Sequence, residues 1–514
     1  MGLSAMSGSG VYAVHAACIR GVEAYPVTVE VSMAEGMPGI SLVGMADSGV
    51  LEARGRIRCA LRAAGFEIPR KSITVNLAPG DMRKSGSGFD LPIAVAILAA
   101  SHQIPEVGLD DTLLVGELAL DGSVCSVRGE VAYQLLARAS GLALVTAINE
   151  QHVPLDSVDH FTLSHIGSLR IGVREAVQRY PHGMPGSEHP GAQPDFSDVV
   201  GQEVAKRGMA IAAAGELGLL MVGSPGAGKT MLARRMTSIL PPIEEREKQE
   251  ALCIHSVMGE AVDGLLRGVR PFRSPHHSIS AAGLIGGGRP VHPGEISLAH
   301  GGVLFLDELA EFSTGVLQTL RQPIEAGVVR LVRAEGAYSF PSRFQLLAAS
   351  NPCPCGYLGD REIDCACTPH AIERYRSKLS GPLADRIDLC IDVMRPDPEL
   401  VVKGAEGMSS ADLREIVERG RAFRTWREGR EGKPEDLGRS KRPLDGAVAA
   451  YRLDGGGETT LIQIARAAHL TGRGIVRLSK IARTIADIEE SEDVRQTHVL
   501  EASMFRGRTG DEVG

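Results

Sequence analysis

The stretch Gly223-Ser-Pro-Gly-Ala-Gly-Lys-Thr230 decides the fold of the residues around it. Its spacing is that of the G-x-x-x-x-G-K-[ST] loop, whose backbone N–H groups surround the phosphates of a nucleoside triphosphate. The apolar run Leu219–Val222 precedes the loop and indicates a buried parallel strand. After the loop, Leu232, Met236 and Ile239 recur at helical spacing. The order strand, glycine loop, helix therefore predicts a phosphate-binding loop in a parallel α/β domain.

Each residue type in this loop has a physical role at a phosphate. Glycine lets successive N–H groups turn toward an anion without a clash from a Cβ atom. Lys229 is expected to reach the terminal phosphates, and the Thr230 hydroxyl to ligate Mg²⁺. We therefore expect ATP or GTP, together with Mg²⁺, to be bound by Gly223, Ser224, Pro225, Gly226, Ala227, Gly228, Lys229, Thr230 and Met231.

Two more apolar runs end in polar side chains suited to hydrolysis. Val303–Leu306 is followed by Asp307 and Glu308, and Leu346–Ser350 is followed by Asn351. Asp307 is expected to hold Mg²⁺, and Glu308 to polarise the attacking water. Asn351 is expected to orient that water or touch the γ-phosphate, because ligands lie outside the carboxyl ends of parallel strands. A strand that merely ends in surface acids is the alternative for Asp307 and Glu308.

Length, charge and cysteine content narrow the class of protein. The 514 residues predict about two to four domains. A net charge of −8 argues against a general nucleic-acid surface, so any such contact has to be local. Met1–Gly10 does not resemble a signal peptide, and the apolar run Leu91–Ala100 is too short for a bilayer. Nine cysteines do not indicate a disulfide scaffold. We expect a cytoplasmic protein with no membrane partner.

Composition divides the chain into four segments. The first mixes strands and helices as in an α+β domain, and a Pro- and Gly-rich linker follows it. Apolar runs then alternate with helices as in a parallel sheet, and from Ser409 onward the pattern is mostly helical, with a loop near 429–442. The boundaries are 1–180, 181–194 (the linker), 195–395 and 396–514. In the first segment we predict strands at 27–31, 73–77 and 143–145 and helices at 90–100 and 130–139.

Longer strings point to one family. They are Arg270-Pro-Phe-Arg-Ser-Pro-His-His277, Gly286-Gly-Gly288, Pro293-Gly-Glu-Ile-Ser-Leu-Ala-His300, Gly302-Val-Leu-Phe-Leu-Asp-Glu308, Ser380-Gly-Pro-Leu-Ala-Asp-Arg-Ile-Asp388 and Thr484-Ile-Ala-Asp487. On these strings essentially the whole chain resembles the magnesium-chelatase-like AAA+ ATPases that include the ComM and YifB proteins. The phosphate loop departs slightly, with Gly-Ser-Pro-Gly where relatives usually have Gly-Pro-Pro-Gly. The resemblance implies an α/β fold with a Lon-protease-like α+β domain, an AAA+ parallel-sheet domain and a helical lid.

The resemblance also assigns roles to two arginines. Arg386 matches the finger that enters a neighbouring subunit's ATP site and stabilises charge on the transferred phosphoryl group. A salt bridge with Asp385 or Asp388 is the alternative. Arg473 matches the lid arginine that senses the nucleotide. A finger acting in trans requires a ring, and the family implies a homo-hexamer.

Two basic inserts bear on the substrate. The stretch 264–302 holds four arginines, four histidines and one acid, and strands at 328–333 and 338–340 predict a β-hairpin with its turn between them. In ring motors of the helicase type, inserts at these places project into the central pore, where arginines hold phosphates without reading sequence. Contacts between subunits are the alternative. The cations expected to bind DNA are Arg273, Arg330 and Arg333.

The resemblance implies a function for the whole chain. It is an ATP-driven ring motor that translocates on branched or single-stranded DNA and promotes branch migration, as a helicase does, during recombination and natural transformation. Recombination proteins are then expected partners. A magnesium-chelatase-like motor that remodels a partner protein is the alternative.

ATP-dependent proteolysis is disfavoured by the N-terminal segment. Ser85-Gly-Ser-Gly-Phe-Asp-Leu-Pro92 and Gly116-Glu-Leu-Ala-Leu-Asp-Gly-Ser123 resemble a Lon-protease-like domain. Proteolysis would need a nucleophilic serine and an activating lysine. The expected nucleophile position carries Asp90, and the expected lysine region, Arg128-Gly-Glu-Val-Ala132, has no lysine. We therefore expect a non-catalytic scaffold.

Four cysteines follow Asn351 as two C-x-C pairs. Four thiolates could supply a tetrahedral zinc site, although structural zinc sites usually have C-x₂₋₄-C spacing. Reduced cysteines in a loop are the alternative. The residues concerned are Cys353, Cys355, Cys365 and Cys367.

Overall fold

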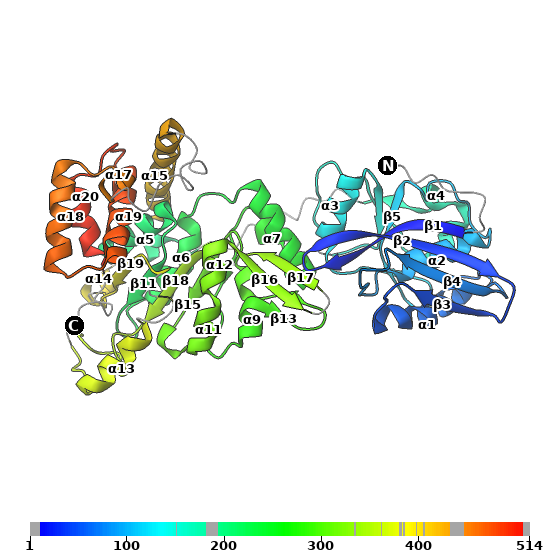
Figure 1. Ribbon diagram of the computed structural model, residues 1–514, viewed down its shortest axis with the longest axis horizontal. Coiled ribbons are helices and arrows are strands. Elements are labelled where there is room, and N and C mark those ends of the chain that lie inside the picture. The colour runs from blue at the N-terminus through cyan, green and yellow to red at the C-terminus, as the bar shows by residue number, and fades with distance from the viewer. Residues whose placement is uncertain are drawn as a thin grey trace.

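Three parts follow one another along the chain: an N-terminal sheet domain, a central domain around a second sheet, and C-terminal helices (Figure 1). The structure is a computed structural model that describes residues 11–506 except 151, 181–193, 334–335, 361, 380–382, 384–385, 397, 404–406 and 432–446. The predicted linker at 181–194, apart from Pro194, therefore lies outside the described residues.

The N-terminal domain is built on a mixed eight-stranded sheet in the order β10-β9-β8-β5-β1-β2-β4-β3. The strands are β1 (Val11–Arg20), β2 (Glu23–Ala34), β3 (Gly39–Val43), β4 (Ser72–Ala78), β5 (Thr112–Leu114), β8 (Ala143–Thr146), β9 (His160–Thr162) and β10 (Gln178–Arg179). The predicted strands at 27–31, 73–77 and 143–145 lie within β2, β4 and β8, so these predictions are confirmed. Parallel and antiparallel pairs occur together, as expected for an α+β domain.

Helices pack on this sheet where the sequence predicts them. α2 (Asp90–Ala100) coincides with the predicted helix, and α3 (Glu130–Ser140) extends the other prediction by one residue. α2 is apolar on all sides because nearly all of it is buried in the domain core. The remaining elements of the domain are α1 (Ser48–Ala63), β6 (Glu117–Leu118), β7 (Val124–Cys125), η1 (Ile166–Ile171) and α4 (Val173–Ala176).

The central domain contains a five-stranded sheet in the order β12-β15-β18-β11-β19, and all its pairs are parallel. The strands are β11 (Leu219–Val222), β12 (Phe272–Arg273), β15 (Val303–Leu306), β18 (Gln345–Ser350) and β19 (Leu389–Asp392). Successive residues of β11 face two different hydrophobic cores, Leu219 and Met221 one and Leu220 the other. This double burial explains the continuous apolar runs in the sequence, and the three predicted strands are confirmed.

Helices and small hairpins surround the central sheet. The helices are η2 (Phe196–Asp198), α5 (Glu203–Gly215), α6 (Lys229–Ile239), α7 (Glu245–Met258), α8 (Asp263–Leu266), α9 (Ala281–Ile285), α10 (Glu295–Leu298), η3 (Leu309–Glu311), α11 (Thr314–Thr319), α12 (Arg321–Ala326) and α13 (Pro369–Leu379). The hairpins are β13 (Gly286–Gly287) with β14 (His292–Pro293), and β16 (Val328–Arg333) with β17 (Gly336–Pro341). The predicted turn at 334–337 is too long, because Gly336 and Ala337 still pair with β16.

The N-terminal domain rests on the central domain at two places. The Gly129 N–H, just before α3, donates to the Ser256 carbonyl of α7 at 3.1 Å. The turn between β1 and β2 lies against the β16–β17 hairpin, where the Arg20 guanidinium sits 5.3 Å from the ring centroid of Tyr338 (Figure 1). Val22 of that turn shares one hydrophobic core with Phe340 of β17. The arginine-bearing hairpin is therefore packed against the N-terminal domain.

The C-terminal part is helical, as predicted. Its helices are α14 (Pro398–Lys403), α15 (Ser410–Glu431), α17 (Ala447–Tyr451), α18 (Gly455–Ala467), α19 (Gly472–Ile488) and α20 (Gln496–Met504). The loop predicted at 429–442 begins later, because α15 continues to Glu431, and from 432 onward it lies outside the described residues. None of the described helices is long and apolar enough to cross a lipid bilayer.

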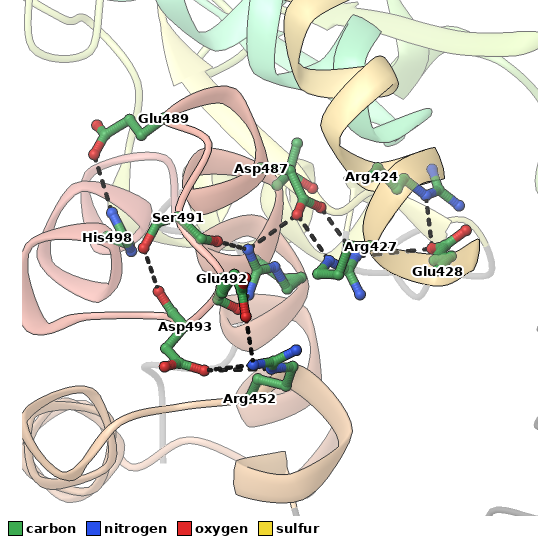
Figure 2. A network of polar contacts seen from close by, with 12 residues as sticks. Arg424, Arg427, Glu428, Arg452, Asp487, Glu489, Ser491, Glu492, Asp493 and His498 are labelled. Atoms are coloured by element: carbon green, nitrogen blue, oxygen red, sulfur yellow. Dashed lines mark hydrogen bonds and ion pairs between the residues drawn. The ribbon is translucent and has the colours of Figure 1, made fainter. Parts of the chain in front are cut away.

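A buried ion network joins α15 to α19 (Figure 2). Both carboxylate oxygens of Asp487 accept from Arg427, at 3.0 and 3.2 Å. Arg483 Nη2 lies 2.9 Å from the same carboxylate and also donates to the Ser491 carbonyl. All three ionic side chains are at most 10% exposed. One carboxylate thus pairs with two buried guanidinium groups, and Arg427 also lies 3.8 Å from Glu428.

Replacing Asp487 with Asn is expected to destabilise the C-terminal helices by about 3–5 kcal/mol, because two buried guanidinium groups lose the carboxylate that they share. The protein's single tryptophan, Trp426 on α15, reports on this region in urea titrations followed by fluorescence. Asp493→Asn is the matched control, since Asp493 is 56% exposed and its pair with Arg452 is worth at most about 1 kcal/mol. Equal midpoints for the two variants would contradict the prediction.

Candidate active site

The predicted phosphate loop connects β11 to α6, at the carboxyl edge of the central sheet. Gly226 and Gly228 have φ angles of 80° and 94°, in the left-handed region that glycine occupies without strain. A Cβ atom on Gly223 would collide with the Val393 carbonyl. α6 begins at Lys229, so its N-terminal N–H groups face the loop and favour an anion there.

Lys229 lies at the centre of the loop. Its ammonium group donates to the carbonyls of Gly223 and Ser224, at 2.7 and 3.0 Å. It also donates to Oδ1 of Asn351, at 3.1 Å. Burial lowers the pKa of Lys229, and the nearby charges of Asp307 and Glu308 oppose this shift. The structure thus brings the predicted lysine and the predicted asparagine into direct contact.

Thr230 and Asp307 meet across the same edge. The Thr230 hydroxyl donates to Oδ2 of Asp307 at 2.8 Å, and Oδ1 of that carboxylate accepts from the Glu308 N–H at 3.0 Å. A hydroxyl and a carboxylate are the hard oxygen ligands that Mg²⁺ prefers, usually beside water and phosphate. These residues therefore fit a magnesium ion bound together with a nucleotide.

Glu308 has an unusual backbone conformation. Its φ of 51° lies in the left-handed region, which costs a non-glycine residue about 1–2 kcal/mol. Such strain concentrates at functional sites, where the surrounding structure holds it in place. The side chain is 57% exposed, and its Oε2 lies 3.4 Å from Nδ1 of His277. The carboxylate is thus presented to solvent beside the phosphate loop.

His277 is a site residue that the sequence analysis missed. The histidines of the basic stretch lack metal-ligand spacing and look like loop or subunit contacts. His277, however, follows β12, which pairs with β15, the strand that ends before Glu308. In the sequence, His277 could have been found from its position a few residues after a strand of the same sheet.

Arg386 and Arg473, the two arginines predicted to act on the nucleotide, lie in different places. Arg386 forms an ion pair with Glu325 of α12. Asp388, proposed as an alternative partner, instead accepts from the Gly218 N–H and from Lys480, at 3.2 and 3.1 Å; Asp385 lies outside the described residues. Arg473 is exposed in the first turn of α19, after the N-cap Thr471 and Gly472. The roles of both arginines stay predictions.

The three cations predicted to bind DNA differ in their contacts within the chain. Arg273 donates to both carboxylate oxygens of Glu295, at 2.6 and 2.8 Å, and to Glu260 at 3.2 Å. Its charge is therefore neutralised inside the chain. Arg330 and Arg333, by contrast, are exposed on β16. The predicted contact with DNA stays a prediction for all three, and Arg273 also links parts of the central domain.

The four cysteines come together in one loop between β18 and α13. Sγ of Cys365 lies 3.6 Å from Sγ of Cys353 and 3.6 Å from Sγ of Cys355. The Cys367 sulfur accepts from the Cys355 N–H at 3.3 Å. The Tyr357 N–H is the main cause that lowers the pKa of the Cys355 thiol to about 6. One sulfur from each residue lies within 4.8 Å of the others, which fits a bound metal ion.

This loop also touches the phosphate loop. Gly356 lies against Pro225, so a larger residue at 356 would clash there. The backbone N–H of Glu362, together with the Ser224 side chain, lowers the pKa of Asp360 by hydrogen bonding. The cysteine loop therefore supports the phosphate loop from outside.

Asp90, at the position where a Lon-type protease is expected to have its nucleophile, forms a structural ion pair in the N-terminal domain. Both oxygens of Asp90 accept from Arg56, at 2.6 and 3.0 Å, and the Leu118 N–H donates to one of them at 3.3 Å. A buried carboxylate held in this way is no nucleophile.

Sheet order and site together define a class of protein. A phosphate loop after β11, an acidic pair after β15 and an asparagine after β18, in the order β12-β15-β18-β11-β19, define a P-loop ATPase fold of the AAA+ type. The chain belongs to the magnesium-chelatase-like AAA+ ATPases of the YifB and ComM type. It matches the family descriptions "Magnesium chelatase, subunit ChlI" at 195–400, "Subunit ChlI of Mg-chelatase" at 29–149 and "Magnesium chelatase, subunit ChlI C-terminal" at 407–506.

Three similar proteins illustrate this membership. YifB of Escherichia coli is 41% identical over 96% of both chains. Competence protein ComM of Haemophilus influenzae is 39% identical over 96% of this chain and 97% of its own. A magnesium-chelatase 67 kDa subunit of Heliobacterium mobile is 24% identical over 38% of this chain and 32% of its own.

Proposed function

We propose that this chain is an ATP-hydrolysing motor that assembles into a hexameric ring, translocates on DNA and promotes branch migration during recombination and natural transformation. The observation that carries the proposal is the exposed pair Arg330 and Arg333, on a hairpin of the same domain as the phosphate loop. The similarity to a protein named competence protein ComM supports the biological setting.

ATP and Mg²⁺ are the cofactors that these residues fit. Residues 223–231 would hold the phosphates, and Thr230 with Asp307 would hold the metal ion. Bound Mg²⁺ neutralises charge that develops on the phosphate oxygens. Glu308 would accept a proton from the attacking water, and Asn351 would orient that water.

DNA is expected to contact the β16–β17 hairpin through its phosphates. Arg330 and Arg333 are exposed, whereas Val329 and Leu331 of the same strand are buried and anchor it. Exposed guanidinium groups hold phosphates electrostatically and read no bases. Binding is therefore expected to be insensitive to sequence and strongly dependent on salt.

The Arg330→Ala/Arg333→Ala variant tests this contact. We expect the ratio of DNA-stimulated to DNA-free ATPase rate to fall to about 1. The slope of log affinity against log salt should fall by about 1.8, or 0.9 for each lost phosphate contact. Arg246→Ala is the control, because Arg246 is a charge on α7 that is 88% exposed. If DNA still stimulates the ATPase rate of the double variant fully, the hairpin is not the DNA contact.

A protein-remodelling motor is the second candidate. The family descriptions and the similarity to a magnesium-chelatase subunit favour it. Such a motor would hydrolyse ATP with the same residues but would show no stimulation by DNA. The same assay therefore separates the two functions.

For the cysteine cluster we propose a structural zinc ion. A tetrahedron with Zn–S bonds of about 2.3 Å has sulfur–sulfur edges of about 3.8 Å. The Sγ separations of 3.3, 3.6 and 3.6 Å among Cys353, Cys355 and Cys365 come close to this value. The short C-x-C spacing therefore does not prevent four sulfur atoms from converging.

Cys365→Ser/Cys367→Ser is expected to contain one zinc per chain less than the wild type, measured by mass spectrometry of the purified protein. ATP binding should weaken too, because the same loop packs on Pro225 of the phosphate loop. Cys59→Ser/Cys125→Ser is the control, since both thiols are exposed in the N-terminal domain. Equal zinc in both variants would leave the four thiols as reduced cysteines.

A further inference from the structure

A second group of metal-type ligands lies in the N-terminal domain, away from the ATPase site. Glu130 is the first residue of α3, His152 follows β8 in the chain, and His160 begins β9. One ligand atom from each lies within 4.8 Å of the others. Their side chains are only 6–10% exposed. Two imidazoles and a carboxylate thus converge in a nearly dry place.

His160 has a buried nitrogen without a hydrogen-bond partner among the described residues. Its Nε2 lies 2.8 Å from the Thr146 hydroxyl, and that hydroxyl donates its single proton to the Ala147 carbonyl, 3.1 Å away. The hydroxyl therefore accepts from Nε2, so Nε2 carries the ring proton and Nδ1 carries a lone pair.

The nitrogen that carries this lone pair lies near a carboxylate. Nδ1 of His160 lies 4.0 Å from Oε1 of Glu130, and Nδ1 of His152 contacts the same oxygen. A lone pair facing a carboxylate oxygen in a buried place is unfavourable, and buried polar atoms usually have partners. A cation bound by all three atoms satisfies Nδ1 of His160 and neutralises Glu130.

The surroundings already orient these ligands. Oε2 of Glu130 accepts from Asn149 at 2.7 Å, and Oε1 accepts from Gln134 at 3.0 Å. The Tyr180 ring stacks on His152 with 3.6 Å between centroids. Metal-binding histidines characteristically use their other nitrogen in a hydrogen bond that fixes the ring, as Nε2 of His160 does with Thr146.

We infer that Glu130, His152 and His160 bind one divalent transition-metal ion of the zinc class. Two imidazole nitrogens and one carboxylate oxygen suit Zn²⁺, with water as the fourth ligand. The site lies directly behind the contact between domains, where Gly129 bonds to Ser256 of α7. The ion would hold three parts of the N-terminal domain together: α3, β9, and the segment that follows β8. These parts meet at the surface that α7 contacts.

The test uses the full chain in the Cys365→Ser/Cys367→Ser background, which removes two of the four thiolates of the cysteine cluster. After chelator treatment and dialysis against Co²⁺ or Zn²⁺, we expect one ion per chain. The Co²⁺ spectrum should show ligand-field bands of nitrogen and oxygen ligands without a thiolate charge-transfer band. His152→Ala should lose the ion, whereas His102→Ala, which removes a 78% exposed histidine of the same domain, should keep it.

Thr146→Val guards against a variant that simply misfolds, because it keeps the shape of the side chain and replaces none of the three proposed ligands. It removes the acceptor that fixes His160, so metal affinity should fall about 10–100-fold. An ion content near zero in the Cys365→Ser/Cys367→Ser background overturns the inference. Unchanged binding by His152→Ala overturns it too, and the cluster is then a metal-free hydrogen-bonded group.

Discussion

Glu308→Gln is expected to lower the rate of ATP hydrolysis about 10²–10⁴-fold while nucleotide binding persists, because the amide cannot accept a proton from water. Glu308 follows β15 in a strained conformation that holds its carboxylate in solvent beside the phosphate loop. Its side chain is separate from the contacts of Lys229 and from the Thr230–Asp307 pair. Removing the charge therefore leaves the binding groups in place.

Single-turnover hydrolysis and equilibrium binding of a labelled nucleotide measure the two effects separately. Glu311→Gln is the matched control, since Glu311 is an exposed glutamate three residues further along the chain. Its rate should equal that of the wild type. If Glu308→Gln hydrolyses ATP at the normal rate, Glu308 is a surface acid after a strand.

Arg386→Ala is expected to bind ATP normally and to lose about 10³-fold or more of the hydrolysis rate, as arginine fingers do. Within one chain, Arg386 pairs with Glu325 of α12. Assembly into a ring would need to exchange this partner for the phosphates of a neighbour's nucleotide. Glu325→Gln removes the competing carboxylate and should retain activity.

A mixing experiment tests whether the finger acts in trans. Lys229→Ala subunits lack a working phosphate loop but keep Arg386, and Arg386→Ala subunits keep the loop. A mixed ring therefore contains complete sites, and ATPase activity should reappear on mixing two inactive proteins. Mixing Arg386→Ala with Lys229→Ala/Arg386→Ala supplies no finger and should stay inactive. No recovery in the first mixture would place Arg386 in a structural role.

The parts of the fold with strong local signals were predictable from the sequence. β11, β15 and β18 are apolar on both faces and end at a glycine loop or a polar residue, so their positions followed from composition alone. The β16–β17 turn was placed less well, because pairing across strands continues through Gly336 and Ala337. Cross-strand pairing is a tertiary property that no short window contains.

The contacts at the site that the sequence did not reveal have the same origin. Arg273 looked free because its stretch holds one acid, yet it pairs with that acid, Glu295, and with Glu260 outside the stretch. The partner of Arg386 is Glu325, on a helix far away in the sequence. His277 reaches Glu308 only because β12 and β15 are neighbours in the sheet. Charge counts along a chain do not reveal which charges meet.

Movement of a four-way DNA junction is the most direct test of the central claim. The wild-type protein with ATP and Mg²⁺ should convert a labelled junction into duplex products, and the same DNA should raise its ATPase rate. Lys229→Ala, whose ammonium group lies at the centre of the phosphate loop, should do neither. Junction movement that is independent of ATP, or hydrolysis that ignores DNA, would contradict a DNA motor and favour a protein remodeller.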